Sequence, residues 1–447
     1  MRFSFIHASD LHLGSPFSAA ASRDQELARM LRQTMFDAFS RLVAEAVERQ
    51  VDFMVLSGDT FDLERVPPAV WLKFISGVRV LEGHGIRVYM VCGNHDPYEG
   101  LPVGAGLPEN LMVFQPGSWQ SAVHERGGVP LAAISGISFK VAAERANLAS
   151  RLGRQRPEQG LFHLAVLHAN VGGRPGHEPY APCSLDDLLS KEVDYWALGH
   201  IHERLVLHQA PHAAYPGVIQ GRSFREQGVK GAFYCEVKGR QLVEHAFLPL
   251  SSVVFAERRV DVSGAQDLAQ IEEALIKEAQ QAEGGCHMVL RFVLEGRTPL
   301  SGELSDQEVQ DGLLEAVNYG LSAQMDSGED SVKDHVCTVA SLKDRTMPEM
   351  DLDRRAKAED FAALVLKERE RILGQAEEGT EELKEALRDL FENPRFSRLL
   401  QEIGPEELEG LMDEAARLAV WRLDPPERPQ GHAASVPAAS TSRSDEA

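Results

Sequence analysis

The feature that most constrains the fold is a set of five short apolar runs, each followed by polar residues. In chain order the runs are residues 2–8, 51–56, 87–92, 162–167 and 195–198. Short apolar runs with glycine or polar residues after them are typical of buried strands. Because open α/β sheets place their ligand sites at the carboxyl ends of strands, these runs predict an α/β fold with one polar site at a sheet edge.

The polar residues after these runs are of the types that bind divalent metal ions. In chain order they form Asp10-Leu11-His12, Gly58-Asp59, Gly93-Asn94-His95-Asp96, His168 and Gly199-His200-Ile201-His202. This number of oxygen and imidazole ligands exceeds what one ion needs and suits two ions that share a carboxylate. Two ions about 3.5–4 Å apart support in-line attack on a phosphate ester. The sequence therefore predicts a two-metal phosphoesterase.

Each motif taken alone also has a purely structural explanation. Asp59 could cap a turn, Asn94 could be a turn residue after Gly93, and any single histidine could be a buried core residue. These explanations would have to account jointly for ligand-type residues that follow buried strands one after another. The shared metal site is the better hypothesis, although a motif match always carries a false-positive risk.

Together these motifs resemble the calcineurin-like metallophosphoesterases. Residues 7–14 and 215–222 are similar to the SbcD/YhaO-type branch of DNA repair exonucleases within that family. The resemblance is strong over the N-terminal half of the chain and weaker beyond it. It implies a two-sheet α/β sandwich with a smaller α+β cap module and a helical C-terminal region.

The resemblance also implies a ligand set. Its first ion would be held by Asp10, His12 and His202. Its second ion would be held by Asn94, His168 and His200, with Asp59 bridging the two. Mixed Asp, Asn and His ligation suits Mn²⁺ and fits Mg²⁺ less well, because Mg²⁺ prefers oxygen ligands. Iron and zinc also fit, so the native metal stays open.

His95 is implied to be the catalytic histidine, oriented by Asp96. The leaving alkoxide needs a proton, and an imidazole that titrates near neutral pH is a natural donor. Asp62 is interpreted as a supporting carboxylate that accepts the second N–H of a ligand imidazole. His7 lies inside its strand and is interpreted as a supporting or structural residue.

The charge of the chain is the main objection to a nucleic-acid substrate. Its 46 Lys and Arg against 68 Asp and Glu give a net charge of −22, whereas nucleic-acid affinity normally comes from basic patches. Bound divalent cations would offset carboxylates locally. Arg174, Arg222 and Arg225 are candidate contacts to flanking phosphates, but solvated surface charge explains them equally well. We therefore expect weak DNA affinity from this chain alone.

The remaining composition is that of a globular, cytoplasmic protein. No stretch approaches the roughly 18 apolar residues of a membrane span. The strand expected directly after Met1 does not resemble a signal peptide. The five cysteines are odd in number and scattered, which favours a reducing compartment over a disulfide framework.

The length of 447 residues predicts more than one domain. Residues 1–252 are expected to form the phosphoesterase domain, and residues 253–345 an α+β module that resembles a cap. Residues 346–423 are expected to form short helices whose apolar stripes dock on a partner or on the chain's own core. Residues 424–447, rich in Pro, Ala and Ser, are expected to be disordered.

The function predicted in this way is a DNA-directed phosphodiesterase in DNA repair. It would act as a 3′-to-5′ exonuclease that also cuts single strands internally. Two alternatives share the same core: a phosphoesterase for small molecules or proteins, and a nuclease-like scaffold for an SMC-like ATPase. The resemblance further implies an SMC-like ATPase as partner and a homodimer formed through the phosphoesterase domain.

Overall fold

The computed structural model describes residues 1–15, 25–62, 66–102, 106–153, 160–174, 178–281, 286–326, 337–349 and 355–374, together with residues 410, 412, 415–420 and 423. The chain divides into two compact units. The first comprises Met1–Arg258, Ile276–Phe292 and Asn318–Leu342, and the second comprises Arg259–Leu275, Val293–Val317 and Lys343–Ala447.

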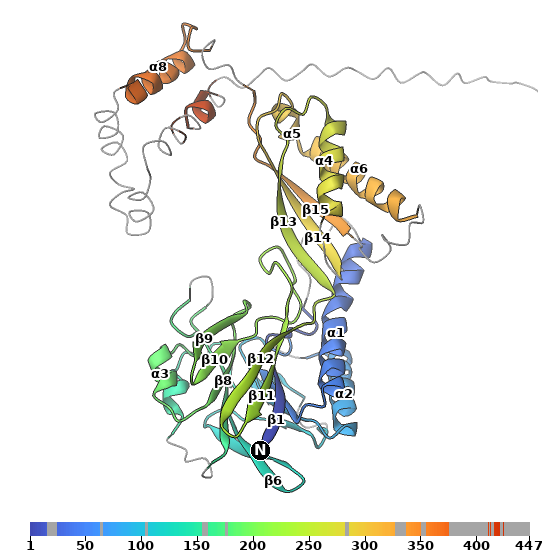
Figure 1. The fold of residues 1–447 in the computed structure, drawn as a ribbon, viewed down its shortest axis with the longest axis vertical. Helices are drawn as coiled ribbons and strands as arrows, with labels where there is room; N and C mark the ends of the chain where they lie inside the picture. The colour runs from blue at the N-terminus through green and yellow to red at the C-terminus, as the bar shows by residue number, and fades with distance from the viewer. Residues whose placement is uncertain are drawn as a thin grey trace, which may run out of the picture. The chain divides into compact units, whose positions relative to one another are not determined.

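Two six-stranded sheets form the body of the first unit (Figure 1). The first sheet has the order β12-β11-β1-β2-β3-β4. Its strands are β1 (Arg2–Ala8), β2 (Phe53–Ser57), β3 (Arg87–Val91), β4 (Leu111–Val113), β11 (Gly231–Lys238) and β12 (Gln241–Pro249). Strands β1 to β4 are parallel, and β11 pairs antiparallel with both β1 and β12.

The second sheet has the order β5-β6-β7-β8-β10-β9. Its strands are β5 (Gln120–Arg126), β6 (Val129–Gly136), β7 (Phe162–His168), β8 (Tyr195–Gly199), β9 (Leu205–Gln209) and β10 (His212–Tyr215). Strands β6, β7, β8 and β10 are parallel, with antiparallel β5 and β9 at the edges. All five apolar runs of the sequence are strands, but they are divided between the two sheets.

The core between the sheets follows from the period-two alternation of the strands. Phe3 and Phe5 of β1 face the second sheet and pack with Phe53, Phe162 and Tyr195. The alternate residues of the same strands face the other way and contact the two long helices. This alternation fixes the register of the strands, since a shift by one residue would exchange the two faces.

Two helices lie side by side against the outer face of the first sheet (Figure 1). They are α1 (Gln25–Glu48) and α2 (Pro68–Gly83). Phe39 and Phe74 stack on each other and belong to the same buried cluster as Ile6 of β1. The second sheet is covered by the short helix α3 (Leu185–Leu189), whose Leu188 shares a buried cluster with Trp196. The central strands of both sheets, such as β2, β7 and β8, are buried on both faces, which explains why they are continuous apolar runs.

A third, three-stranded sheet has the order β13-β14-β15. Its strands are β13 (Val253–Asp261), β14 (His287–Glu295) and β15 (Cys337–Asp344). Between them lie α4 (Leu268–Gln280), α5 (Ser301–Leu304) and α6 (Gln307–Asp326). Apart from the short α5, this is the β-α-β-α-β order expected for the smaller α+β module.

The described part of the C-terminal region contains the helix α8 (Phe361–Gly374). Its Ala362 and Leu366 form a buried cluster with Ala416 and Val420. Of residues 346–423, which were expected to form short helices, residues 375–409 lie outside the described residues, as does the tail expected over 424–447. No helix in the described ranges is long and apolar enough to span a bilayer.

Candidate metal centre

The predicted ligands lie in loops at the carboxyl ends of β1, β2, β3, β7 and β8, where the two large sheets face each other. Backbone hydrogen bonds join the first two loops, from Asp10 N to Gly58 O at 3.0 Å and from His12 N to Asp59 O at 2.9 Å. A further contact reaches across from the second sheet, because His200 N donates to the Asp10 carboxylate at 3.1 Å. The polar site therefore belongs to the paired edges of two sheets.

Several ligand residues have unusual backbone conformations. Six non-glycine residues in the described chain have a positive φ, and four of them are predicted ligands. They are Asp10 (50°), His12 (47°), Asp59 (49°) and His200 (106°). Such conformations cost on the order of 1–3 kcal/mol each and cluster at functional sites. The surrounding fold thus holds these loops in positions that the chain would not adopt locally.

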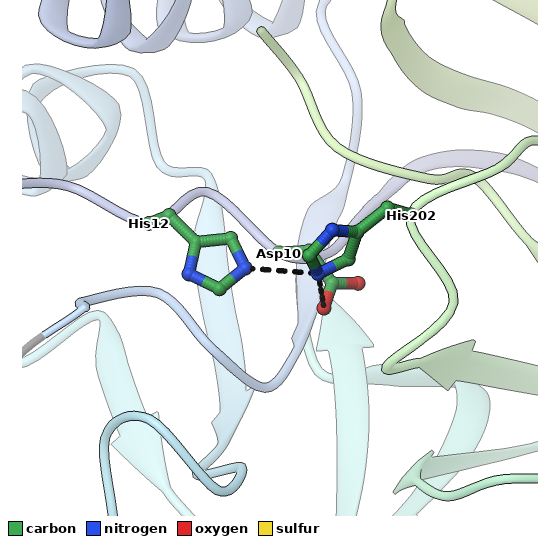
Figure 2. Close-up of side chains that lie close together, drawn as sticks. All are labelled: Asp10, His12 and His202. Atoms are coloured by element: carbon green, nitrogen blue, oxygen red, sulfur yellow. Dashed lines mark hydrogen bonds and ion pairs between the residues drawn. The ribbon is translucent and has the colours of Figure 1, made fainter. Parts of the chain in front are cut away.

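Asp10, His12 and His202 form the first cluster (Figure 2). The two Nε2 atoms of His12 and His202 face each other at 3.2 Å, and His202 Nε2 lies 3.8 Å from Asp10 Oδ1. His202 Nδ1 donates to Glu226 Oε1 at 2.8 Å, so its Nε2 presents a lone pair to the cluster. His12 Nδ1 faces Asp62 Oδ1 at 3.5 Å without a hydrogen bond.

The second cluster is built around His168. Its Nδ1 donates to the Ser57 carbonyl at 3.0 Å, so its Nε2 carries the lone pair. That atom lies 3.0 Å from Asn94 Oδ1 and 3.4 Å from Asp59 Oδ2. The ring of His200 is 5.2 Å from that of His168, and its Nε2 donates to the Glu178 carbonyl at 2.8 Å.

The contacts of the two clusters suit bound metal ions. Lone pairs that face one another repel unless a cation lies among them. Metal-bound imidazoles characteristically donate their other N–H to a carboxylate or carbonyl, as His168, His200 and His202 do here. Ligand atoms of Asp10 also lie within 4.8 Å of those of Asp59 and His168, so Asp10 connects the two clusters. The donor set fits two divalent ions close together.

The electrostatics of the site favour the protonation states that metal binding needs. Burial lowers the pKa of His12, and burial beside His168 lowers the pKa of His200 to about 4. Both imidazoles are then neutral near pH 7. Burial would raise the pKa of Asp10, but its histidine neighbours, His168 first, lower it to about 2. The carboxylate is therefore ionised.

Two glycines are required by the close approach of the loops. A Cβ on Gly93 would lie 2.2 Å from Asp59 Oδ1 and 2.9 Å from the His168 ring. A Cβ on Gly58, which also has a φ of +92°, would lie 2.4 Å from His168 Nδ1. Neither distance is compatible with a side chain, so both positions depend on glycine.

His95 lies beside the first cluster, with its ring 4.9 Å from that of His12. Its side chain is 45% exposed, whereas those of His12 and His168 are buried. His95 Nδ1 pairs with Asp62 Oδ1 at 2.5 Å, and this hydrogen bond raises the pKa of His95. Asp62 therefore stands between His12 and His95 and contacts both imidazoles.

Asp96 does not have the role expected from the sequence. Its carboxylate accepts the backbone N–H groups of Gly93 at 2.7 Å, Thr60 at 2.8 Å, Asp59 at 3.1 Å and Phe61 at 3.3 Å. The chain turns after His95 so that Asp96 points back under the loop of Asp59. It fixes that loop, while the residue paired with the His95 imidazole is Asp62.

The three predicted phosphate-binding arginines differ in their surroundings. Arg222 contacts the carboxylates of Glu226 and Asp62. Arg225 is exposed. Arg174 is half-buried, and its Nε has no hydrogen-bond partner. Glu226, which holds His202, was missed by the sequence analysis. The one signal for it was its position four residues after Arg222.

The supporting position of His7 matches its interpretation from the sequence. The residue is fully buried, with Nδ1 3.0 Å from the Tyr195 hydroxyl and Nε2 2.9 Å from Ser57 Oγ. Ser57 is also the residue whose carbonyl accepts from His168. His7 therefore packs behind the second cluster and holds the strand end from which the Asp59 loop begins.

The chain matches two protein-family models. The family model for calcineurin-like phosphoesterases matches residues 3–204, which contain all seven predicted ligands. A second model, for the middle domain of the metallophosphoesterase YhaO, matches residues 255–347. The chain is similar to the uncharacterized metallophosphoesterase YhaO of Bacillus subtilis, with 32% identity over 300 residues, 66% of this chain and 72% of that protein.

The chain is also similar to archaeal proteins named DNA double-strand break repair protein Mre11. That of Sulfurisphaera tokodaii is 28% identical over 205 residues, 45% of this chain and 49% of that protein. That of Thermoplasma acidophilum is 25% identical over 225 residues, 49% of this chain and 57% of that protein. The chain thus spans about half the length of these two relatives.

Proposed function

The chain belongs to the calcineurin-like phosphoesterase family, and from this premise we propose that it is a nuclease-type phosphodiesterase that hydrolyses DNA. The observation that carries the proposal is the convergence of lone-pair donors in two adjoining clusters, with the exposed His95 beside them. The similarity to proteins named for DNA double-strand break repair supports DNA as the substrate.

In this proposal Asp10, His12 and His202 hold one ion, Asn94, His168 and His200 hold the other, and Asp59 bridges them. When bound, two divalent ions supply an activated water and neutralise the charge on the phosphoryl oxygens. Mn²⁺ is the proposed native metal. The protein's own contribution is to hold the ligand imidazoles by their second nitrogens, so that the ligand geometry exists before substrate arrives.

His95 is the proposed general acid. Asp62 accepts from its Nδ1, which directs Nε2 away from that carboxylate. Burial would raise the pKa of Asp62, but hydrogen bonds, from His12 first, lower it. The hydrogen bond to the ionised Asp62 then raises the pKa of His95 and favours its protonated form. A protonated imidazole can give its Nε2 proton to the leaving sugar oxygen when the P–O bond breaks.

The finer specificity that we propose is 3′-to-5′ exonuclease activity in DNA repair, together with internal cutting of single strands. Arg174, whose Nε has no hydrogen-bond partner, and exposed Arg225 are the remaining candidates for a contact to a flanking phosphate, because Arg222 is held by carboxylates. The net charge of −22 would oppose long-range attraction of DNA. We therefore expect modest DNA affinity that falls as salt rises.

The test is an assay of purified protein on three substrates. These are a duplex labelled at either the 3′ or the 5′ end, a circular single strand, and bis(p-nitrophenyl) phosphate. With Mn²⁺ we expect stepwise loss from 3′ ends, linearisation of the circle and hydrolysis of the ester. Excess EDTA should abolish all three activities, and Asp59→Ala should do the same with Mn²⁺ present.

Two outcomes would redirect the proposal. Hydrolysis of the ester without cleavage of any DNA would favour the alternative of a phosphoesterase for small molecules or proteins. Full activity after complete removal of metal would overturn the two-metal mechanism itself. Repeating the assay with Mg²⁺, Fe²⁺ and Zn²⁺ separates the choice of metal from the choice of substrate.

A further inference from the structure

We propose that Arg222 is a positioning residue that ties the metal ligand His202 to the proton donor His95 through two carboxylates, Glu226 and Asp62. The inference deepens the proposed function and rests on it, since it concerns the same centre. Five side chains carry it. They lie in a continuous chain of contacts, from His202 to Glu226, Arg222, Asp62 and His95.

The first arm of this chain holds His202. Arg222 grips both oxygens of Glu226, with Nη2 2.8 Å from Oε1 and Nε 3.2 Å from Oε2. The backbone N–H of Arg222 also donates to Oε2 at 2.8 Å. A two-pronged Arg–carboxylate pair fixes orientation as well as distance. Glu226 is therefore held in one position, with Oε1 2.8 Å from His202 Nδ1.

The second arm holds His95. Arg222 Nη1 lies 3.4 Å from Asp62 Oδ2 and 3.3 Å from Ser15 Oγ, and Ser15 also donates to that oxygen of Asp62. The other oxygen of Asp62 faces His95 Nδ1 at 2.5 Å. The two oxygens of Asp62 thus have different partners, and rotation of this carboxylate would break its contact with Arg222 and its contact with His95 at once.

The same contacts make a direct role in binding phosphate a poor explanation for Arg222. Each of its three side-chain nitrogens has a carboxylate or hydroxyl partner, and the side chain is 17% exposed. Without the guanidinium, Glu226 and Asp62 would lose the cation that stands between them. Each would then be free to turn away from its histidine. Arg222 therefore acts on His95 through Asp62, and on His202 through Glu226 together with a direct contact of its Nη2 with His202 Nδ1 at 3.3 Å.

The proposal predicts that one substitution will disturb two separable properties. Arg222→Met should weaken Mn²⁺ binding at one of the two sites by about 10–100-fold, the usual effect of removing a residue that supports a ligand. It should also slow cleavage of an ester with a poor alkoxide leaving group more than cleavage of a nitrophenyl ester. Glu226→Gln should reproduce mainly the loss of metal affinity. Asp62→Asn should reproduce the leaving-group effect together with a smaller loss of metal affinity, because Asp62 also faces His12 Nδ1.

The matched control is Arg240→Met. Arg240 makes a two-pronged pair with Asp194, with Nε 3.0 Å from Oδ2 and Nη2 2.8 Å from Oδ1. Asp194 precedes β8, so this pair lies at the amino end of the strand, opposite the ligand loops. The control removes the same kind of interaction without touching the centre, and should leave Mn²⁺ affinity and leaving-group dependence unchanged.

The experiment measures Mn²⁺ affinity and stoichiometry by calorimetry on the full chain, and the ratio of rates on the two esters. Arg222→Lys keeps the charge but not the planar fork, so it should retain only part of both properties. It also keeps the test decisive if Arg222→Met does not fold.

Several results would overturn the proposed positioning role of Arg222. These are Arg222→Met behaving like Arg240→Met, Arg222→Lys behaving like the unaltered protein, or a loss confined to the KM for DNA. The Mn²⁺ titration does not depend on substrate. Absence of DNA cleavage would therefore count against the proposed function, whereas the role of Arg222 would still be decided by the Mn²⁺ affinities.

Discussion

At the residue scale, His95 differs from the other histidines of the centre in exposure and in partner. His12 and His168 are buried with one nitrogen aimed into a cluster of donors, whereas His95 is exposed and paired through Nδ1 with Asp62. A residue placed in this way can act on a substrate without holding an ion. Binding and chemistry should therefore be separable by mutation.

The corresponding prediction is for His95→Asn. The variant should still bind two ions per chain but lose turnover on DNA by roughly 10²–10⁴-fold, the usual contribution of a general acid. The loss should be smaller for bis(p-nitrophenyl) phosphate, whose leaving group scarcely needs a proton. Metal content by elemental analysis and steady-state rates check this. If the metal content falls in step with the rate, His95 is itself a ligand.

Residue roles were predictable where a motif specified them and not where a contact is made between distant parts of the chain. The ligand types could be recognised because each follows a strand. The role of Glu226 could not, because Glu226 meets His202 only after the chain returns from β10, and the contact of Asp62 with His95 forms only when β2 and β3 lie side by side. The family resemblance implied that Asp96 orients His95, yet the turn aims the side chains of these two residues at different neighbours.

At the scale of elements, the strands were predictable and their division into sheets was not. Apolar runs predicted β1, β2, β3, β7 and β8, but β11 and β12 extend the first sheet from residues beyond the second. That pairing depends on the layer of aromatic residues between the sheets, which no local pattern reveals. The predicted ATPase partner and homodimer stay predictions, and most of the helices assigned to docking lie outside the described residues.

The loop after β3 gives a test at this scale. Gly93→Ala would place a Cβ 2.2 Å from Asp59 Oδ1. Overpacking of this kind costs about 1–3 kcal/mol, and we expect it to appear as a loss of Mn²⁺ affinity of about 10–100-fold with the fold retained. Gly83→Ala, at the end of α2 with no atom within 4 Å of the added carbon, is the control. Equal Mn²⁺ affinity in both variants would mean that the loop is not tightly packed.

At the scale of the whole molecule, two buried histidines that are not among the predicted ligands should make stability depend on pH. Burial lowers the pKa of His7 to about 3 and that of His124 to about 4, both below the usual value of 6.5. The unfolded chain therefore takes up these protons first. The stability associated with the neutral forms is fully present above about pH 6.5 and is lost as pH falls toward 4.

The prediction is a fall in the free energy of unfolding of about 1.4 kcal/mol per pH unit for each of these histidines across that window. Urea unfolding between pH 4 and 7.5 measures the slope. His124→Gln should lower the pH slope of the free energy of unfolding by the contribution of one proton. The metal centre should be unaffected, because His124 packs on Phe53 and Tyr89 rather than on any predicted ligand. An unchanged slope would show that His124 is protonated in the folded protein.

The division of the predicted ligands between two sheets has a mechanical consequence. Asp10, His12 and Asn94 follow strands of the first sheet, and His168, His200 and His202 follow strands of the second. With the ligand sets proposed above, each ion would have ligands from both sheets and would therefore link the two sheets at this edge. Removal of the ions by a chelator would break this link, whereas the aromatic layer would still hold the two sheets together at the opposite edge. The sheets would therefore separate first at the edge where substrate would enter.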